Sequence, residues 1–337
     1  MKVVALANRK AWLVDTPEPK AGPGEVVVKI VAAPICGSNM GAYFGAEEVV
    51  NDGHEGAGEV VAVGTGAQLQ RGDRVMMQPL PGCGDCDDCQ RGDAIYCAHR
   101  GEPHGMFAQY TVQKDRLCVK LPDAVDCVHG SLMGCALGPG YDALKQLGLA
   151  ARLGKPAVAP PLVVTGLGPV GLGAVALATW QGARVIALDP VAWRRERALA
   201  LGAGATFDPT EADILDILTD EIAGTGPSFG IDASGNAAAE RLLIDLATVR
   251  GRIAFVGENH DTIPVSPSRD LIRKGLTLIG CWHMNVNDTP DLIRFLTDAP
   301  AKADLLISHT FGFSEVQEAF DTFASRESAK VILNPWQ

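Results

Sequence analysis

The sequence predicts an α/β protein in which a doubly wound parallel sheet is joined to a second, β-rich region. From about Leu137 to Trp282, short β-type runs alternate with segments of helical length, such as Ala192–Leu201 and Ala237–Ala247. This alternation is typical of a parallel sheet covered by helices. The predicted strands of this part are residues 162–165, 184–188, 229–233, 252–256 and 276–280.

The chain on either side of this segment has a different pattern. Residues 1–136 contain short β-type runs separated by Gly- and Pro-rich turns. The clearest of these runs are Val3–Leu6, Glu25–Ala32, Gly58–Val63, Arg74–Met77 and Phe107–Val112. Residues 283–337 are mixed, with a predicted helix near Ser314–Phe323 and a last strand at Lys330–Leu333. We therefore expect a domain of residues 1–136, a second domain of residues 137–282 and a C-terminal segment of residues 283–337.

Composition limits the class of protein and its partners. The 337 residues include 29 Lys and Arg against 40 Asp and Glu, a formal net charge of −11. Without a basic stripe, nucleic acid and anionic membranes are not expected as partners. No apolar run reaches the roughly 18 residues of a membrane-spanning helix, and the first residues, MKVVALANRK, do not have the pattern of a secretory signal. We expect a soluble, cytoplasmic protein.

A glycine motif at the start of the second domain predicts a dinucleotide site. The run Gly166-Leu167-Gly168-Pro169-Val170-Gly171 follows a β-type run and opens an Ala- and Leu-rich helix, and Asp189 closes the next strand. The glycines would allow a tight turn, the approach of a pyrophosphate to the helix start and close packing of the helix on the strand. The carboxylate favours NAD over NADP, although Arg194 and Arg195 could accept a 2′-phosphate or lie on a solvated helix face. The alternative interpretation of the glycine motif is an ordinary βαβ crossover that binds no ligand.

Four of the nine cysteines lie within fifteen residues. Cys83, Cys86, Cys89 and Cys97 have the spacing C-x2-C-x2-C-x7-C inside a lobe of about residues 81–100. Four thiolates in one compact loop can enclose zinc without an open position, which is typical of a structural site. Two disulfides and an iron–sulfur cluster are alternatives.

A second set of metal-ligating residues is scattered along the chain. Cys36, His54 with Glu55, and Cys135 are separated by long segments, so spacing alone does not show that they meet. Taken singly, a cysteine is more often a small buried apolar residue and a histidine a structural one. Two thiolates and an imidazole would suit a catalytic zinc whose fourth position is open.

Over nearly its whole length the chain resembles the zinc-dependent medium-chain dehydrogenase/reductase superfamily of the alcohol dehydrogenase type. The matching motifs, in order, are the CGS turn at Cys36, the GHE turn at His54, VGTGAQLQRGDRV, the four-cysteine lobe, GCALGPGYDAL and GLGPVG with Asp189. The resemblance implies a GroES-like catalytic domain, a Rossmann domain and an active site in the cleft between them. It also implies a homodimer or homotetramer formed through the edge strand near residues 276–282.

The resemblance also implies roles for individual residues. Cys36, His54 and Cys135 would bind the catalytic zinc, with Cys135 preferred to the nearby Cys127. Glu55 would lie behind the metal, although a buried carboxylate paired with an arginine is the alternative. Ser38 would accept the proton of the substrate hydroxyl, or would simply bond the local backbone. Lys330 would reach the pyrophosphate of the cofactor, or would be an exposed lysine at a strand edge.

The implied function is hydride transfer from an alcohol to NAD, with two zinc ions per chain, one catalytic and one structural. We expect a small-molecule substrate, namely a secondary alcohol of a polyol, sugar or amino sugar. The alternatives are a simple primary or secondary alcohol, a zinc-independent enone or quinone reductase, and a nucleotide-binding protein without turnover.

Two positions depart from the family pattern. The family usually has Asp where this chain has Asn39, and many relatives have His where it has Gly41. Without that histidine, the proton relay would end at His99, His104, Glu47 or water.

Overall fold

The computed structural model describes residues 1–101, 105–149, 161–222 and 229–337. These residues form two compact units, one of Met1–Cys135 with Asn285–Gln337 and the other of Ala136–Met284. The predicted domain boundaries, after residues 136 and 282, lie within two residues of these limits.

The first unit contains two β-sheets. Its larger sheet follows the order β15-β16-β3-β5-β6-β8, with β7 also paired to β3, and its smaller sheet has the order β2-β1-β4. The strands of the larger sheet are β3 (Glu25–Pro34), β5 (Gly56–Val63), β6 (Arg74–Met77), β7 (Tyr110–Lys114), β8 (Cys118–Lys120), β15 (Ile307–Gly312) and β16 (Lys330–Asn334). The smaller sheet contains β1 (Lys2–Ala7), β2 (Lys10–Asp15) and β4 (Val49–Val50).

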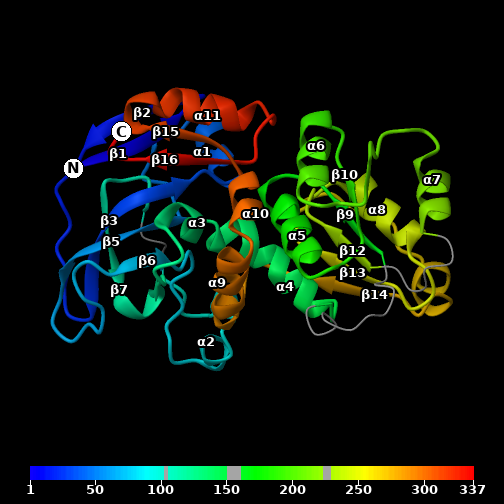
Figure 1. Ribbon diagram of the computed structural model, residues 1–337, viewed down its shortest axis with the longest axis horizontal. Helices are drawn as coiled ribbons and strands as arrows, with labels where there is room; N and C mark the ends of the chain where they lie inside the picture. Colours follow the sequence, from blue (N-terminus) through cyan, green and yellow to red (C-terminus); the bar gives the residue numbers. More distant parts are fainter. Residues whose placement is uncertain (102–104, 150–160, 223–228) are drawn as a thin grey trace. The chain divides into compact units, whose positions relative to one another are not determined.

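The C-terminal segment belongs to the first unit because its last strand completes the larger sheet. β16 pairs antiparallel with β3, matching Ile332 with Pro34 and Leu333 with Ala33. In Figure 1 the red C-terminal strands accordingly lie among the blue strands of the N-terminal part. Apolar side chains from both ends of the chain, including Val28, Phe107, Phe320 and Val331, share one core. The helices of this segment are α9 (Thr289–Asp298), α10 (Pro300–Leu305) and α11 (Val316–Ala324).

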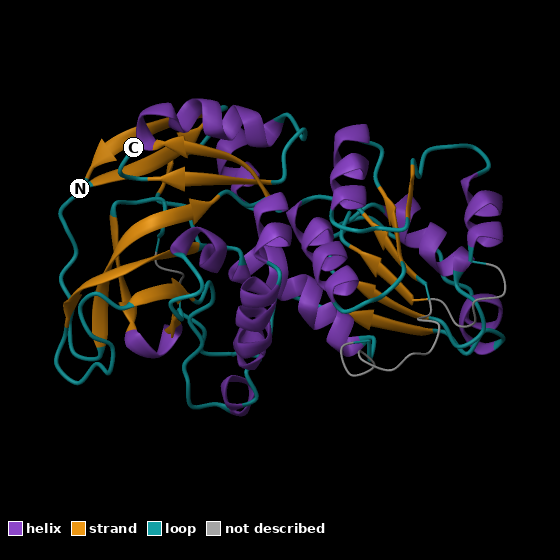
Figure 2. Ribbon diagram, viewed as in Figure 1, coloured by secondary structure: helices purple, strands orange, loops and turns teal. Residues whose placement is uncertain are grey.

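The second unit is a doubly wound parallel sheet, as predicted. Its strand order is β11-β10-β9-β12-β13-β14, every pairing is parallel, and Figure 2 shows helices on both sides of the strands. The strands are β9 (Leu162–Thr165), β10 (Val185–Leu188), β11 (Ala205–Phe207), β12 (Phe229–Asp232), β13 (Arg252–Phe255) and β14 (Thr277–Gly280). The helices include α4 (Gly138–Gln146), α5 (Pro169–Trp180), α6 (Ala192–Ala200), α7 (Ile214–Glu221) and α8 (Ala237–Leu246). The strand order reverses between β9 and β12, and ligands of such sheets bind at this reversal.

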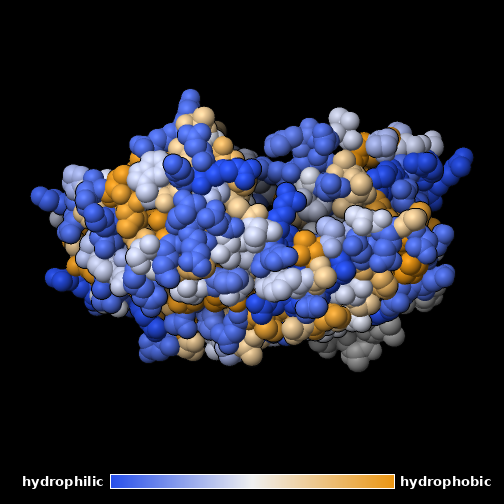
Figure 3. Space-filling view, turned by 90° about the horizontal axis from the view of Figure 1, so that it is seen from above, coloured by the Kyte–Doolittle hydropathy of each residue, from blue (hydrophilic) through white to orange (hydrophobic). Residues whose placement is uncertain are grey.

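One predicted strand begins later than expected. Phe107–Val112 becomes β7 only from Tyr110 onward, because Phe107 turns into the core and Ala108 forms an isolated bridge with Val3. The surface visible in Figure 3 is mostly hydrophilic, and its apolar residues gather in separate patches. Across the described part of the chain, the helices are too short or too polar to cross a bilayer.

Candidate active site and metal centres

Four side chains from distant parts of the first unit converge on one point. The ligand atoms of Cys36, His54, Glu55 and Cys135 all lie within 4.8 Å of one another. Cys36 follows β3, while His54 and Glu55 directly precede β5, which is paired with β3. Cys135 lies in a single π-helical turn, Met133–Leu137, a geometry often found at functional sites. The fold therefore brings together the set that sequence spacing could not join.

The donor set fits a catalytic zinc. Two sulfurs and one imidazole nitrogen are ligands that zinc prefers, and Cys36 and His54 are only half-buried, whereas Cys135 and Glu55 are buried. A hydrogen bond from Cys135 holds the pKa of Cys36 well below its usual value despite burial, and positive charge on Lys330 and His54 acts in the same direction. The same hydrogen bond and burial raise the pKa of Cys135. These opposite shifts favour a thiolate on Cys36 and a protonated thiol on Cys135 when no metal is bound.

Lys330 is not where the sequence analysis predicts it. Its side chain is fully buried, and its ammonium donates to both carboxylate oxygens of Glu55, at 2.5 and 2.8 Å, and to the carbonyl of Ile35 at 3.3 Å. These contacts use all three donors of an ammonium group, so Lys330 has none left for a pyrophosphate. The Glu55 carboxylate is grouped with the predicted ligand atoms, and its partner is this lysine rather than an arginine.

The Glu55–Lys330 pair adjusts the charge next to the ligands. Burial raises the pKa of Glu55 to about 7, against the opposing effect of the Lys330 ammonium. Burial disfavours the charged form of Lys330, but the negative charges of Glu55, Cys36 and Cys135 outweigh it, so the pKa of Lys330 is raised. With Lys330 charged, the carboxylate form of Glu55 is matched within the buried site.

The loop that carries Cys36 also presents Ser38 and Asn39. Ser38 is exposed at the start of α1 (Asn39–Phe44), and its hydroxyl makes no helix-capping hydrogen bond. Asn39 is buried and accepts a hydrogen bond from the backbone N–H of Cys36 at 2.8 Å. Its amide group donates to the backbone oxygen of Asp52 at 2.9 Å and to the Asp52 carboxylate at 2.8 Å. Asp52 is a residue that the sequence analysis missed.

The end of the proton relay is not identified by contacts of this loop. Gly41 is exposed within α1, and both Glu47 and His99 are exposed, with no hydrogen bond to Ser38 among the described residues. His104 lies outside the described residues.

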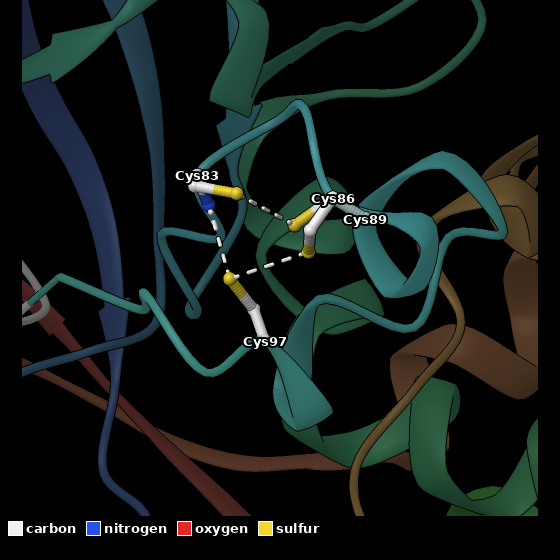
Figure 4. Close-up of side chains that lie close together, drawn as sticks. All are labelled: Cys83, Cys86, Cys89 and Cys97. Carbon is white, nitrogen blue, oxygen red and sulfur yellow. Dashed lines mark hydrogen bonds between the residues drawn. The ribbon is translucent and has the colours of Figure 1, made fainter.

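The four-cysteine lobe forms a second compact cluster, shown in Figure 4. The sulfurs of Cys83, Cys86, Cys89 and Cys97 lie within 4.8 Å of one another. Cys86 precedes the short helix α2 (Asp87–Gln90), which contains Cys89. The sulfurs of Cys83 and Cys89 are 3.9 Å apart and those of Cys86 and Cys97 3.7 Å apart, and all four cysteines are free. Because a disulfide requires about 2.05 Å, the two-disulfide alternative is wrong for this lobe.

Local hydrogen bonds and burial shift the pKa values of two of these thiols in opposite directions. Backbone N–H groups of Asp85 and Cys86 lower the pKa of Cys83 to about 6, whereas burial raises that of Cys89 to about 12. A metal ion would have to displace the remaining thiol protons, as zinc does in closed structural sites. The donor set and its closed shape fit structural zinc.

The glycine motif lies at the reversal point of the parallel sheet. Gly166 has φ +79° directly after β9, and a Cβ atom there would lie 2.6 Å from the backbone of Ser234 beyond β12. At Gly171 a Cβ would approach the carbonyl oxygen of Gly166 to 1.8 Å. At Gly168, directly before α5, a Cβ would meet nothing within 4 Å. Neither protein packing nor a positive φ requires glycine at position 168. The missing side chain leaves open space at a helix N-terminus, where a phosphate fits.

The predicted acid stands beside this turn. One carboxylate oxygen of Asp189 accepts from the backbone N–H of Leu167 at 2.7 Å and the other from that of Val191 at 2.8 Å. Arg194 Nη1 lies 3.5 Å from the same carboxylate, while Pro169 and Val170 form the first turn of α5. The residues expected to hold a dinucleotide are therefore grouped in the second unit, apart from Lys330, which belongs to the first.

A Rossmann sheet together with two thiol-rich clusters that could hold metal is typical of zinc-dependent oxidoreductases. Comparison with known families agrees: residues 22–123 match the alcohol dehydrogenase GroES-like domain, and residues 169–298 match the zinc-binding dehydrogenase domain. The chain belongs to the zinc-dependent medium-chain dehydrogenase/reductase superfamily. It is an oxidoreductase related to alcohol and threonine dehydrogenases.

Individual relatives align along almost the entire chain. An L-threonine 3-dehydrogenase of Pyrococcus abyssi is 30% identical, over 98% of this chain and 98% of that protein. An alcohol dehydrogenase of Escherichia coli CFT073, solved with NADH, superposes with a TM-score of 0.87 at 26% identity and 99% coverage of both chains. A galactitol-1-phosphate dehydrogenase of Escherichia coli gives 0.84 at 26% identity, covering 99% of this chain and 100% of that one.

Proposed function

We propose that this protein oxidises a secondary alcohol of a polyol, sugar or amino sugar, using NAD and a zinc ion held by Cys36, His54 and Cys135. The observation that carries the proposal is the convergence of these three side chains, two of them half-buried, beside the exposed Ser38. Zinc in such a site supplies a Lewis acid that lowers the pKa of a substrate hydroxyl.

The chain's own residues would position and deprotonate the substrate. The Ser38 hydroxyl is exposed and has no capping bond to the α1 backbone, so its Oγ is available to accept the proton of the substrate hydroxyl and pass it to water. The buried Glu55–Lys330 pair keeps a carboxylate behind the ligands without leaving it unpaired. Asn39 holds the backbone of Cys36 in place through its side chain.

NAD is the cofactor we propose, because a carboxylate stands at the end of β10. The 2′-phosphate of NADP would be repelled by Asp189, and the Escherichia coli CFT073 relative was solved with NADH. Asp189→Asn keeps the shape of the side chain and removes its charge. We expect the ratio of kcat/KM for NAD to that for NADP to fall by about tenfold. An unchanged ratio would contradict the role of Asp189.

A hydroxy amino acid is the second candidate substrate. It is favoured by the Pyrococcus abyssi relative, which is an L-threonine 3-dehydrogenase. The polyol proposal is favoured by the galactitol-1-phosphate dehydrogenase. Both substrates carry a secondary hydroxyl next to polar groups, so the same metal site serves either reaction.

Initial rates of NAD reduction test the function directly. The panel contains simple alcohols, polyols, cyclitols, amino sugars and hydroxy amino acids, each with and without a zinc chelator. Cys36→Ala is the matched control, because it removes one ligand of this site and leaves the four-cysteine lobe intact. We expect one class to react, the reaction to be chelator-sensitive, and Cys36→Ala to abolish it.

Other outcomes identify the rival functions. Activity retained by Cys36→Ala would reject the ligand assignment, and enone reduction that survives chelation would indicate a zinc-independent reductase. NADH binding without turnover on any panel member, in protein that holds two zinc ions, would favour a nucleotide-binding protein without this activity.

We further propose a homodimer formed through the edge of the parallel sheet, with a homotetramer as the alternative. β14 is the last strand in the order of this sheet, and its outer edge pairs with no strand among the described residues. An open edge of apolar sequence favours pairing with a second copy. The nine free thiols fit a reducing compartment, so we propose a cytoplasmic location.

A further inference from the structure

Asn39 makes a set of hydrogen bonds that fixes which way its amide points. Its Oδ1 accepts from the N–H of Cys36, and its Nδ2 donates to the backbone and side-chain oxygens of Asp52. Turning the amide over would place Oδ1 against two oxygens and Nδ2 against an N–H donor. The orientation is therefore dictated by its neighbours, in a side chain that is only 1% exposed.

This arrangement links a metal ligand to a carboxylate. Asn39 holds Cys36 twice, because its backbone N–H also donates to the Cys36 carbonyl at 3.1 Å. On its other side the Asn39 amide donates to the backbone and side-chain oxygens of Asp52, whose side chain is partly buried. The position of the Cys36 loop thus depends on Asp52 through one intervening amide.

The hydrogen bonds between Asn39 and Asp52 also explain how an asparagine is accommodated at position 39. A carboxylate at position 39 would place its oxygens 2.8–2.9 Å from the Asp52 carboxylate and carbonyl oxygens, where like charges repel. With Asn39 and Asp52 together, the site keeps one negative charge and one donating amide. The charge has moved to residue 52, two positions before the ligand His54.

We propose that Asp52 is a positioning residue for the catalytic metal site, which orders the Cys36 loop through Asn39 and supplies the negative charge that Asn39 lacks. This inference rests on the proposed zinc site of Cys36, His54 and Cys135. Partners behind metal ligands commonly change metal affinity by about 10–100-fold when they are removed. Because Asp52 acts through one intermediate, an effect near the lower limit is expected.

The test compares the affinity of the catalytic-site metal in three variants of the full-length protein. Asp52→Asn keeps an acceptor for Asn39 but removes the charge, and we expect roughly tenfold weaker zinc binding. Asn39→Asp places two carboxylates together and should weaken binding further. The exchange variant Asn39→Asp with Asp52→Asn restores one charge and one amide, so it should regain part of that loss. Recovery is partial because the backbone oxygen of residue 52 still faces position 39.

Transfer of zinc to a chromophoric chelator measures both sites in one titration. The four-cysteine zinc is the internal reference, and Asp298→Asn, at an exposed position, controls for net charge. Cobalt substitution confined to the catalytic site adds a thiolate charge-transfer band that reports the geometry at Cys36 and Cys135. Catalytic-site affinity in Asp52→Asn within about twofold of wild type, or Asn39→Asp and Asp52→Asn effects that simply add, would overturn the inference.

Failure of the underlying site assignment gives a different result. A wild-type protein that holds only the zinc of the four-cysteine lobe would reject the catalytic metal site itself. If Asn39→Asp does not fold, Asp52→Asn alone still decides, because it preserves the shape and hydrogen bonding of the loop.

Discussion

Gly168 and Gly171 belong to the same motif, but each requires glycine for a different physical reason. Substitution of each residue therefore distinguishes an effect on cofactor binding from an effect on folding. A Cβ at Gly168 enters empty space, whereas a Cβ at Gly171 would lie 1.8 Å from the Gly166 oxygen. We expect Gly168→Ala to leave the urea midpoint unchanged, because the new methyl group meets no protein atom. NADH binding should weaken by roughly tenfold, because the methyl group would crowd the bound pyrophosphate and such overpacking costs about 1–3 kcal/mol. Gly171→Ala should lower the urea midpoint.

Fluorescence titration of NADH and urea denaturation, run on both variants, give the comparison. Normal NADH affinity in Gly168→Ala would mean that no phosphate approaches this residue. An undisturbed midpoint in Gly171→Ala would contradict the close contact of α5 with the preceding turn.

The buried Glu55–Lys330 pair gives a prediction on stability. Lys330→Met removes the ammonium and leaves a carboxylate unpaired among buried groups, which typically costs about 3–5 kcal/mol. We expect the free energy of unfolding to fall by that amount in urea. The double variant Glu55→Gln with Lys330→Met removes both charges and should recover most of the loss. A double variant no more stable than the single one would show that packing, rather than charge, explains the effect.

At this scale, motifs predict residue types better than they predict partners. Cys36, His54 and Cys135 could be named from the resemblance, and the fold groups them. Lys330 was expected at a pyrophosphate because a basic residue stands in its motif, yet burial turns it toward Glu55. The Asn39–Asp52 bond joins residues thirteen positions apart, and no local pattern encodes it.

Among the elements, the π-helical segment Pro267–Ile272 before β14 contains an ion cluster that predicts a dependence on pH. Asp270 accepts from Arg269 and Arg241 and from the backbone N–H of Ser266. These contacts hold the pKa of Asp270 well below its usual range, Arg269 having the largest effect. A lowered carboxyl pKa contributes stability that is fully present above the unfolded value of about 4, and that is lost progressively as the pH falls from there through the lowered folded value.

Asp270→Asn should therefore destabilise the protein clearly at pH 7 and less at pH 3, where part of the contribution of the carboxylate has been lost. Urea midpoints of the wild type and of Asp270→Asn at both values give the difference, which cancels any loss of zinc common to the two proteins. Asp220→Asn, at an exposed position on α7, is the matched control. An equal penalty at pH 3 and pH 7 would mean that the arginines do not act on Asp270 through its charge.

Elements with strong periodicity could be predicted, and weakly marked ones could not. β9, β10, β12, β13 and β14 were expected within a residue or two, because buried parallel strands are continuous apolar runs. β11 has only three residues, all half-buried, and lacks such a run. β2 and α9 were also missed, although both carry local signals. β2 forms a tight hairpin with the preceding β1. α9 has Pro290 in its first turn and buries Leu292, Phe295 and Leu296 on one face.

At the scale of the whole molecule, hydrogen bonding along β14 predicts how two copies would pair. The N–H groups of Thr277 and Cys281 donate to carbonyl oxygens on the β13 side, of Gly251 and Phe255. Because backbone groups alternate along a strand, the N–H of Gly280 points to the open edge. A Cβ at Gly280 would meet nothing within 4 Å, so substitution there does not disturb the core.

Gly280→Pro removes this outward donor and leaves the bonds to β13 in place, because proline is tolerated where the N–H of an edge strand faces outward. If the dimer forms through β14, we expect Gly280→Pro to be monomeric in sedimentation velocity at concentrations where the wild type is dimeric. Gly280→Ala keeps the N–H and should remain dimeric. A monomeric wild type would reject the assembly, and a dimeric Gly280→Pro would move the interface away from this strand. Zinc content and the near-UV spectrum of each variant would establish that the sites and the fold are intact, so that any change in mass is assigned to the edge strand alone.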